Sequence, residues 1–406
     1  MNEAPRHPHE PGHHDPLGSA SDDAIARSRR AFLRTGAVAL AGLTLGVAEP
    51  ALATPGGPGK PHGATPFGPV VVADPGSGAA YARAVRLGNS RSWLATFQQF
   101  GAPGFAIHRS DDDGRTWYPL SNVPSTGDTS GVWLQPFLYE LPRAFAGFPK
   151  GTLLFAGNAL GNFTSTTIQL YASRDRGVTW TFLSTVAEGG APIPENGNTP
   201  VWEPFLLLHK DRLICYYSDQ RDPRYGQKLA HQSSRNLRTW GPVVDDAVGT
   251  DYDQRPGMTT VARIHERLWI LTHEAGDNFY AVHYKLARDP ESFGPARDIV
   301  LRDQDGYVPS AAPTVSWSDS GGPNGTIVVT ANGDQDLFVN RHLGDPGRWT
   351  RVPSAIPSGY SRQTIPLACP DSRRQPGLLF IITGPDYAEN GPIQAGVVPL
   401  TGRSPR

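Results

Sequence analysis

Short stretches in which apolar and polar residues alternate recur along most of the chain. A period of two places successive side chains on opposite faces of a strand, so such stretches indicate strands with one packed face. Gly, Pro, Asp and Asn gather between them, as is typical of turns. We therefore expect an all-β chain of many short strands. The clearest candidates are Tyr81–Leu87, Ser92–Phe97, Thr152–Ala156, Ile168–Ser173, Phe205–His209, Leu213–Ser218, Thr260–Ile264, Leu268–Thr272, Thr326–Thr330 and Leu378–Thr383.

A repeated turn sequence separates these strands. Ser110–Trp117 and Ser173–Trp180 both fit the pattern S-x-D-x-G-x-T-W, and Ser233–Trp240 is a decayed copy. Weaker copies lie at Asp289–Gly294 and Gly344–Trp349, and the closing aromatic residues are 63, 60, 53 and 56 residues apart. Similarity at a nearly fixed period predicts stacked or radial repeats. In each turn we expect the Asp to accept backbone hydrogen bonds, the Gly to adopt positive φ, and the Trp to fill the space between neighbouring sheets.

Each repeat begins with a strand, and six such openings predict six blades of a β-propeller. A propeller protects its short strand edges by radial repetition, which suits units of this size. We expect one six-bladed domain over residues 68–406. The openings lie near Tyr81, Trp133, Val201, Gly257, Ser310 and Ser361.

Composition supports this interpretation and excludes several classes of protein. The 406 residues include 45 Gly and 39 Pro, which disfavour long helices, and 38% of the chain is hydrophobic, enough for a sizeable core. A net charge of −1 argues against a nucleic-acid partner. The two cysteines, Cys215 and Cys369, make no disulfide framework, and we expect both to be buried small apolar residues. No zinc motif or phosphate-binding loop is present in the sequence, so we expect no cofactor and no metal.

The first 53 residues have the features of a removable export signal. Arg29 and Arg30 precede Phe32-Leu33, an apolar run spans 37–48, and Ala51-Leu52-Ala53 matches a cleavage site. About 12 apolar residues are too few to cross a bilayer as a helix. We therefore expect a twin-arginine signal over 1–53, a Gly/Pro-rich linker over 54–67, and a secreted monomer that makes no membrane contact once the signal is cleaved. The mature chain carries 32 basic and 32 acidic residues.

Two glutamates are the strongest candidates for chemistry. Glu203 lies in the apolar, aromatic opening of the third blade, and Glu274 ends an apolar strand of the next blade, 71 residues later. Neighbouring blades project their innermost strands into one channel, so we expect the two carboxylates to converge there. Paired carboxylates are the groups that glycoside hydrolysis requires. For each glutamate the structural alternative is an ion pair or a solvated strand end.

Several segments are similar to glycoside hydrolase family 93, and the turns resemble the aspartate boxes of sialidase-like propellers. The most specific likeness runs from Trp202 to Glu274. The matching segments are Trp202–Phe205, Tyr216–Asp222, Gln227–Gln232, Thr239–Asp245, Arg255–Met258 and Gly359–Arg362.

The resemblance implies a retaining exo-α-1,5-L-arabinanase that releases arabinobiose from linear arabinan. It assigns Glu203 as nucleophile and Glu274 as acid/base, although the sequence alone leaves the order of the two open. It also implies that Tyr360 contacts or tunes the nucleophile. His273 stands where we expect an aromatic residue such as Tyr in the family.

Nine further residues at or near the openings are candidates for substrate binding. Arg255 and Arg362 are expected to hold sugar hydroxyls or to keep Glu203 ionised, and Trp133 and Trp202 to stack on sugar rings. For the tryptophans the alternative is packing between blades, and for Asn158 it is a turn cap. The full set is Arg83, Trp133, Gln135, Asn158, Trp202, Asp222, Arg255, Tyr307 and Arg362.

Two other functions fit a propeller with these residues. A sialidase uses three arginines and a Tyr–Glu pair, which Arg83, Arg255 and Arg362 with Tyr360 and Glu203 could imitate. The first blade lacks the Arg-Ile-Pro run typical of sialidases. A glycan-binding propeller without catalysis is the other alternative, and hydrolysis by Glu203 and Glu274 is untenable if their carboxyl groups do not converge in one channel.

Overall fold

Twenty-four strands and one short 3-10 turn, Pro346–Arg348, make up the regular structure of the described residues. The computed structural model describes residues 65–88, 90–102, 104–124, 133–276, 279–367, 377–387 and 389–400. No helix within these ranges has the length and apolar character needed to cross a membrane. The expected export signal, the expected linker up to residue 64 and Cys369 lie outside them.

The first three blades are four-stranded antiparallel sheets in chain order. Blade 1 contains β2 (Ala79–Arg86), β3 (Trp93–Gln99), β4 (Gly104–Ser110) and β5 (Tyr118–Pro124). Blade 2 contains β6 (Trp133–Glu140), β7 (Leu153–Gly161), β8 (Ser165–Ser173) and β9 (Thr181–Gly189). Blade 3 contains β10 (Val201–His209), β11 (Arg212–Asp219), β12 (Lys228–Ser234) and β13 (Val244–Ala247).

Blades 4 and 5 repeat this order, and blade 6 is completed by the first strand of the propeller. Blade 4 contains β14 (Gly257–His265), β15 (Leu268–Ala275), β16 (Ala281–Ala287) and β17 (Asp298–Val300). Blade 5 contains β18 (Thr314–Ser318), β19 (Thr326–Thr330), β20 (Leu337–Asn340) and β21 (Thr350–Val352). Blade 6 contains β22 (Gln363–Leu367), β23 (Leu378–Thr383), β24 (Ile393–Pro399) and β1 (Phe67–Ala73).

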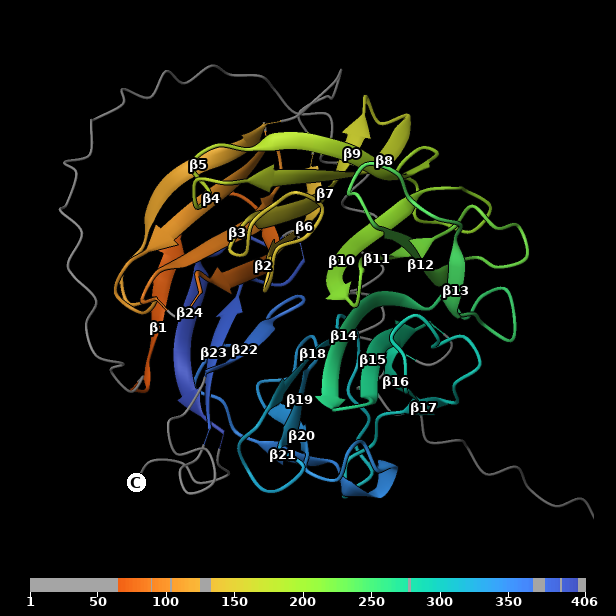
Figure 1. Cartoon of the computed structure of the whole chain (residues 1–406). Helices are drawn as coiled ribbons and strands as arrows, with labels where there is room; N and C mark the ends of the chain where they lie inside the picture. The colour runs from red at the N-terminus through yellow and green to blue at the C-terminus, as the bar shows by residue number, and fades with distance from the viewer. Residues whose placement is uncertain are drawn as a thin grey trace, which may run out of the picture. The chain divides into compact units, whose positions relative to one another are not determined.

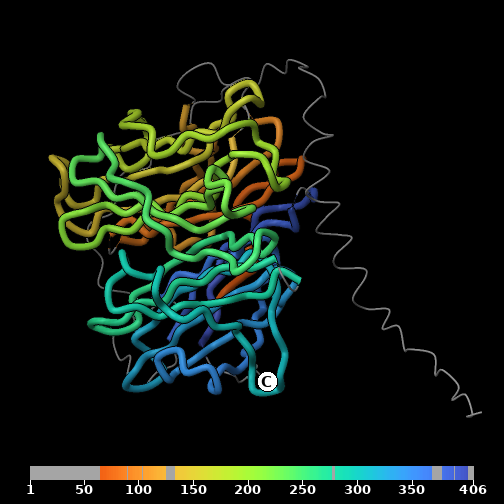
Figure 2. The backbone as a smooth tube through the Cα atoms, turned by 90° about the vertical axis from the view of Figure 1, so that its right-hand side faces the viewer, coloured from red at the N-terminus to blue at the C-terminus, as the bar shows by residue number. Residues whose placement is uncertain are grey.

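The six sheets surround a common centre, which confirms the six-bladed propeller. Figure 1 shows β2, β6, β10, β14, β18 and β22 next to this centre and the fourth strands at the periphery. Figure 2, turned by 90°, shows blades 1–3 in one half of the propeller and blades 4–6 in the other. The pairing of β1 with β24, for example Val70 opposite Ala395, joins the two ends of the ring.

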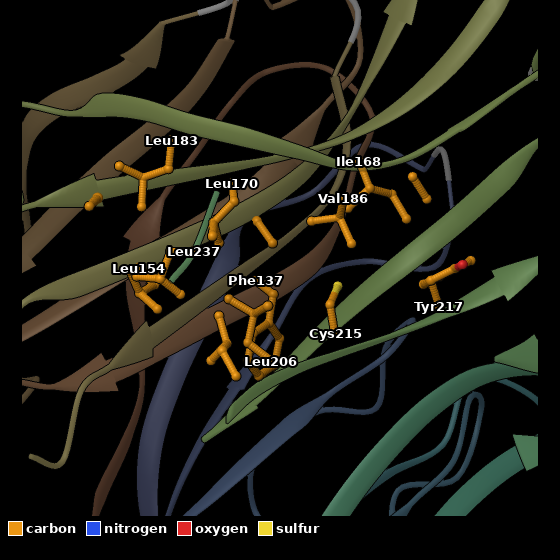
Figure 3. Close-up of a cluster of buried hydrophobic side chains, with 14 of the residues drawn as sticks. Phe137, Leu154, Ile168, Leu170, Leu183, Val186, Leu206, Cys215, Tyr217 and Leu237 are labelled. Atoms are coloured by element: carbon orange, nitrogen blue, oxygen red, sulfur yellow. The ribbon is translucent and has the colours of Figure 1, made fainter. Parts of the chain in front are cut away.

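Apolar clusters fill the spaces between neighbouring blades. The largest lies between blades 2 and 3 and contains Phe137, Leu154, Leu206 and Cys215 (Figure 3). Burial of the Cys215 thiol raises its pKa, in keeping with the expected role as a small apolar residue. Because each blade packs on both neighbours, the inner strands are held rigidly around the channel.

The repeated turns connect the third and fourth strands, at the outer part of the blades. In blade 1, Asp112 accepts hydrogen bonds from the backbone N–H groups of Arg115 and Thr116 at 3.0 and 2.9 Å. Gly114 has φ +89°, and Trp117 packs near Phe380 of blade 6, 6.3 Å between ring centroids. These turns therefore join blades together, as expected, and take no part in the channel.

Candidate active site

Each inner strand has a non-glycine residue in the left-handed backbone region, either at its second or third position or two residues before its start. In blades 1–4 this residue forms a β-bulge, because the register of the inner strand with its neighbour shifts there. Such a backbone costs roughly 1–2 kcal/mol per residue, and bulges of this kind re-aim side chains next to functional sites. The six residues and their φ values are Tyr81 (51°), Gln135 (60°), Glu203 (63°), Met258 (63°), Ala312 (46°) and Ser361 (58°).

Glu203 is held in the channel by donors from three blades. Tyr81 donates its hydroxyl to Oε1 at 3.0 Å, while Ser218 Oγ and the backbone N–H of Met258 donate to Oε2 at 2.7 and 2.9 Å. Its own backbone N–H donates to Gln135 Oε1 at 3.0 Å. Hydrogen bonds from three donors fix the orientation of the carboxylate.

Glu274 is 2% exposed and approaches Glu203 through a gap above Gly257. A Cβ built on Gly257 would lie 3.6 Å from Glu274 Oε1 and 3.8 Å from Glu203 Oε2. The backbone N–H of Ala312 in blade 5 donates to Glu274 Oε2 at 2.8 Å, which fixes the carboxylate. The two carboxylates therefore face the same small space from neighbouring blades, as the sequence predicted.

The second strands of blades 1–3 carry buried polar residues at the same position as Glu274. Gln98, Asn158 and Ser218 each lie opposite the residue that precedes the left-handed one, as Glu274 lies opposite Gly257. Gln98 accepts from the N–H of Gln135, and Asn158 donates to the carbonyl of Val201, in each case in the next blade. Glu274 therefore occupies a position that joins successive blades elsewhere in the ring.

Tyr81 contacts Glu203 directly, and Tyr360 packs on Tyr81. Tyr360 packs against Tyr81, with ring centroids 5.2 Å apart, and its hydroxyl lies 3.8 Å from Met258 Sδ. Burial, the charge of Glu203 and the neighbouring tyrosines Tyr360 and Tyr387 raise the pKa of Tyr81 well above its usual value. Tyr81 is therefore a stable hydrogen-bond donor to Glu203, and the expectation that Tyr360 contacts or tunes the nucleophile stays a prediction.

A cleft opens at this place in the channel and exposes one face of the site. Arg83 lies in its wall, donates to the carbonyl and hydroxyl of Ser361 at 2.7 Å each, and lies 5.8 Å from the ring centre of Tyr81. Burial lowers the pKa of Arg83 to about 10. The cleft is lined by Tyr81, Arg83, Gln135, Pro136, Phe137, Glu203, Pro204, Phe205, Met258, Thr259, Thr260 and Ser361.

Gln135 and Asn158 form a chain of hydrogen bonds that supports Glu203. Gln135 Oε1 accepts from the N–H of Glu203 and, at 3.4 Å, from Asn158 Nδ2. Asn158 is fully buried, donates to the Val201 carbonyl at 2.8 Å and accepts from the N–H of Thr167 at 3.0 Å. The expected channel-lining role is therefore corrected for Asn158, while Gln135 does reach the cleft.

The two tryptophans proposed as sugar platforms are both buried. Trp133 is 2% exposed and packs against Phe105 and Tyr171 between blades 1 and 2, at 5.4 and 6.2 Å between ring centroids. Trp202 donates its indole N–H to Gln220 Oε1 at 2.8 Å. Neither ring presents a face on which a sugar could stack, so the expected stacking role is wrong and the packing alternative applies.

Arg362 is a structural residue of blade 6. It is fully buried, and burial lowers its pKa to about 10. A guanidinium that is engaged by main-chain oxygens does not hold sugar hydroxyls, so its expected contact with substrate or Glu203 is corrected. It donates to the carbonyl oxygens of Asp334, Gln335, Asp336, Ile356 and Pro357.

Arg255 positions the loops beside Gly257. It donates to the side chain of Asn196, and to Gln220 Oε1 and Gln227 Oε1 at 3.3 Å each. Gln227 in turn lies at the carboxylate gap, since its Nε2 is 2.8 Å from the position of a Gly257 Cβ. Because Arg255 and Arg362 are engaged in these separate networks, they do not form a sialidase-type arginine triad with Arg83.

Asp222 and Tyr307 make contacts outside the group around Glu203. Asp222 accepts from Arg224 at 2.7 Å and from Lys228 at 3.0 Å. Tyr307 is exposed and donates its hydroxyl to Asp334 at 2.9 Å. Their assignment to substrate binding stays a prediction.

Four residues that surround Glu203 and Glu274 escaped the sequence analysis: Tyr81, Ser218, Gln227 and Gly257. Tyr81 and Gly257 were recognised only as markers of blade openings, and the bulge that turns Tyr81 toward Glu203 has no short sequence signature. Ser218 and Gln227 lie within segments similar to the family, yet the alternation of β11 alone does not show that Ser218 reaches Glu203.

Solved structures of similar chains share this fold. The GH93 α-L-arabinofuranosidase of Fusarium graminearum in complex with arabinobiose is 37% identical, with a TM-score of 0.76 over 82% of this chain and 98% of that one. The α-L-arabinanase of Penicillium chrysogenum complexed with arabinobiose is also 37% identical, with a TM-score of 0.77 over 83% and 99% of the two chains.

More distant structures share the fold alone. The NanB sialidase of Streptococcus pneumoniae is 10% identical, with a TM-score of 0.55 over 81% of this chain and 70% of that one. The chain matches no protein-family model and no curated protein.

Proposed function

The chain belongs to glycoside hydrolase family 93, and from this we propose that it hydrolyses linear α-1,5-L-arabinan from the non-reducing end and releases arabinobiose. Similar enzymes bind arabinobiose. A nearly uncharged mature chain is compatible with a neutral polysaccharide substrate.

One observation carries the proposal: Glu203 and Glu274 face the same space above Gly257. A pair of carboxylates on either side of the scissile bond is the minimum that glycoside hydrolysis requires. A propeller that only binds glycans has no need of this pair, particularly since Glu274 is almost completely buried. Burial of a carboxylate is costly unless it performs a function or is compensated.

The two glutamates have different environments, which suggests different roles. Glu203, with its three donors, is suited to remain ionised and to attack the anomeric carbon as nucleophile. Glu274, buried between blades, is suited to hold a proton and to give it to the leaving glycosidic oxygen. The glycosidic bond breaks as a bond from Glu203 to the anomeric carbon forms. Glu274 then accepts a proton from water. The resulting hydroxide attacks the anomeric carbon and breaks its bond to Glu203, so that the configuration is retained.

An assay of the full chain on several substrates tests the proposal. Debranched arabinan should yield arabinobiose on chromatography, whereas sialosides should yield no free sialic acid. Release of long oligosaccharides would contradict the exo mode, and release of sialic acid alone would contradict the substrate. Glu203→Gln should abolish turnover while arabinan still binds, because the amide retains the shape of the side chain but cannot attack.

We also propose that the protein is secreted as a monomer by the twin-arginine route. The support is the Arg29-Arg30 pair, the short apolar run and the Ala51-Leu52-Ala53 sequence. Mass spectrometry of the protein from culture medium should find Thr54 as the first residue. Replacing Arg29 and Arg30 by Lys should retain the precursor in the cell, and light scattering should give the mass of one chain.

A further inference from the structure

Blade 4 brings together three potential metal ligands that are widely separated in sequence. They are His273 on β15, His283 on β16 and Asp298 at the start of β17, and their ligand atoms all lie within 4.8 Å of one another. His273 Nε2 is 2.9 Å from Asp298 Oδ1, and His283 Nδ1 is 3.3 Å from Asp298 Oδ2. His273 and His283 are register partners on adjacent strands, which fixes the two rings with respect to each other.

This cluster is separate from the proposed active site. Successive side chains of a strand point to opposite faces of its sheet, so His273 lies on the face opposite Glu274. Glu274 faces blade 5, where it accepts from Ala312, whereas Lys285, on the same side as His273, reaches the carbonyl of Asp246 in blade 3. The cluster therefore lies on the side of blade 4 that faces blade 3.

The hydrogen bonds of His273 determine what the cluster can hold. Its Nδ1 lies 3.0 Å from the backbone carbonyl oxygen of Glu274, so Nδ1 must carry a hydrogen. A neutral His273 then directs the lone pair of Nε2 toward the carboxylate of Asp298. Two lone pairs at this distance repel each other unless a cation lies between them, and that cation is either a proton or a metal ion. His273 itself is fully buried.

The ligand types, and the 3.3 Å between His283 Nδ1 and Asp298 Oδ2, fit a metal ion, while His273 Nε2 and Asp298 Oδ1 are closer, at 2.9 Å. Two imidazoles and a carboxylate are a usual ligand set for zinc, and zinc bonds of 2.0–2.2 Å in a tetrahedron place ligand atoms about 3.3 Å apart. Metal-bound histidines commonly donate their second N–H to a backbone carbonyl, as His273 does to Glu274. The side chain of Asp298 is 42% exposed, which provides a path for the ion and a position for water as fourth ligand.

We propose that His273, His283 and Asp298 bind a divalent transition-metal ion of the zinc type. The ion would join β15, β16 and β17 directly behind Glu274 and so stabilise the strand that carries this residue. The role is structural, because the ligands lie on the face opposite the carboxylate pair. Lys285, the register partner of Asp298, lies on the same side of blade 4, and its ammonium donates to the carbonyl oxygens of Asp246 and Gly294 at 2.7 and 3.1 Å.

Calorimetric titration of the EDTA-treated full chain with zinc chloride tests the proposal. The wild type should bind one zinc ion at a site that is lost in His283→Gln. His265→Gln is the matched control, because His265 is an exposed histidine of the same blade. Its replacement should leave zinc binding at this site unchanged. Weaker binding by His7, His9, His13 and His14 of the leader should be common to all three proteins.

Two further measurements keep the test independent of the fold and of the proposed activity. Zinc in about 100-fold excess over its dissociation constant should raise the Tm of the wild type by about 5 °C but leave that of His283→Gln unchanged. Cobalt(II) should give the visible absorption bands of a tetrahedral site. Should His283→Gln not fold, Asp298→Asn replaces it. Equal zinc binding by wild type and both variants, or bands of octahedral cobalt only, would overturn the proposal, whatever the activity on arabinan.

Discussion

Blades 2 and 4 use the same pair of positions in different ways. In blade 2, Leu134 lies opposite Asn158, and in blade 4, Gly257 lies opposite Glu274. Both second-strand residues reach the following blade, Asn158 at the Val201 carbonyl and Glu274 at the Ala312 N–H, each at 2.8 Å. Register partners share one face of a sheet, so the side chain of Leu134 lies beside Asn158, whereas Gly257 places no side chain beside Glu274.

This difference shows how a fold built from repeats can carry a single candidate active site. The position on the second strand is already fixed by its bond to the next blade. A carboxylate placed there has a defined orientation, and a glycine opposite it gives access to the channel. The reactive group thus acquires its precision from a contact that is structural in the other blades.

Glu274→Gln should have the largest effect of the changes considered for this pair. The amide oxygen can still accept from Ala312, so the link between blades persists, but the side chain no longer supplies a proton. We expect kcat on debranched arabinan to fall by about 10³-fold or more. Glu188→Gln, a change of an exposed carboxylate on β9, is the control and should leave kcat unaltered. Near-normal turnover by Glu274→Gln would remove Glu274 from the mechanism.

Gly257→Ala tests the gap itself. The added methyl group would lie between the two carboxylates and 2.8 Å from Gln227 Nε2, which must move. Displacement of reacting groups by about 1 Å can cost about 10²-fold, so we expect a loss of that order in kcat with the fold retained. Gly241→Ala is the matched control, because its Cβ would meet only Ser233 O, at 3.4 Å. Wild-type rates in Gly257→Ala would show that the gap is not needed for access.

Much of the architecture behind this comparison can be predicted from the sequence, because the architecture depends on periodicity. The repeated Asp–Gly–Trp turns and the six strand openings predict six blades, and the segments around Glu203 and Glu274 predict their convergence. The closure of blade 6 by β1 was not predicted: Phe67, where β1 begins, was assigned to the linker. Its pairing with β24 joins residues more than 300 positions apart, and no local pattern encodes such a contact.

The assignments that failed concern large residues near the openings. In the sequence, Trp133, Trp202 and Arg362 lie beside the strand openings that face the channel. Strand alternation and the bulges nevertheless direct their side chains into the packing between blades. Which way a side chain points changes with a shift of one residue in register. The bulges produce such shifts at Tyr81, Gln135, Glu203 and Met258, which is why Tyr81 was overlooked and Tyr360 was preferred.

Asn158→Ala tests the structural half of the comparison. The change removes the hydrogen bonds to the Val201 carbonyl and from the Thr167 N–H, and leaves both groups buried without these partners. We expect the free energy of unfolding to fall by about 2–4 kcal/mol, measured by urea denaturation, with kcat within a few-fold of wild type. Loss of activity at unchanged stability would instead restore Asn158 to substrate binding.

Tyr81→Phe should have the smallest effect and extends the comparison to blade 1, where the residue in the left-handed position contacts Glu203 directly. Loss of this one donor, with Ser218 and Met258 retained, should lower kcat about 10-fold. Because burial and the charge of Glu203 hold the pKa of Tyr81 well above its usual value, the phenol keeps its proton in neutral and mildly alkaline solution. The ratio of wild-type to Tyr81→Phe rates should therefore be constant from about pH 6 to pH 9. Tyr360→Phe, which retains the ring that packs on Tyr81, should change the rate less. A ratio that falls toward alkaline pH would mean that Tyr81 ionises within this range, and that it stabilises Glu203 by some means other than a permanent hydrogen bond.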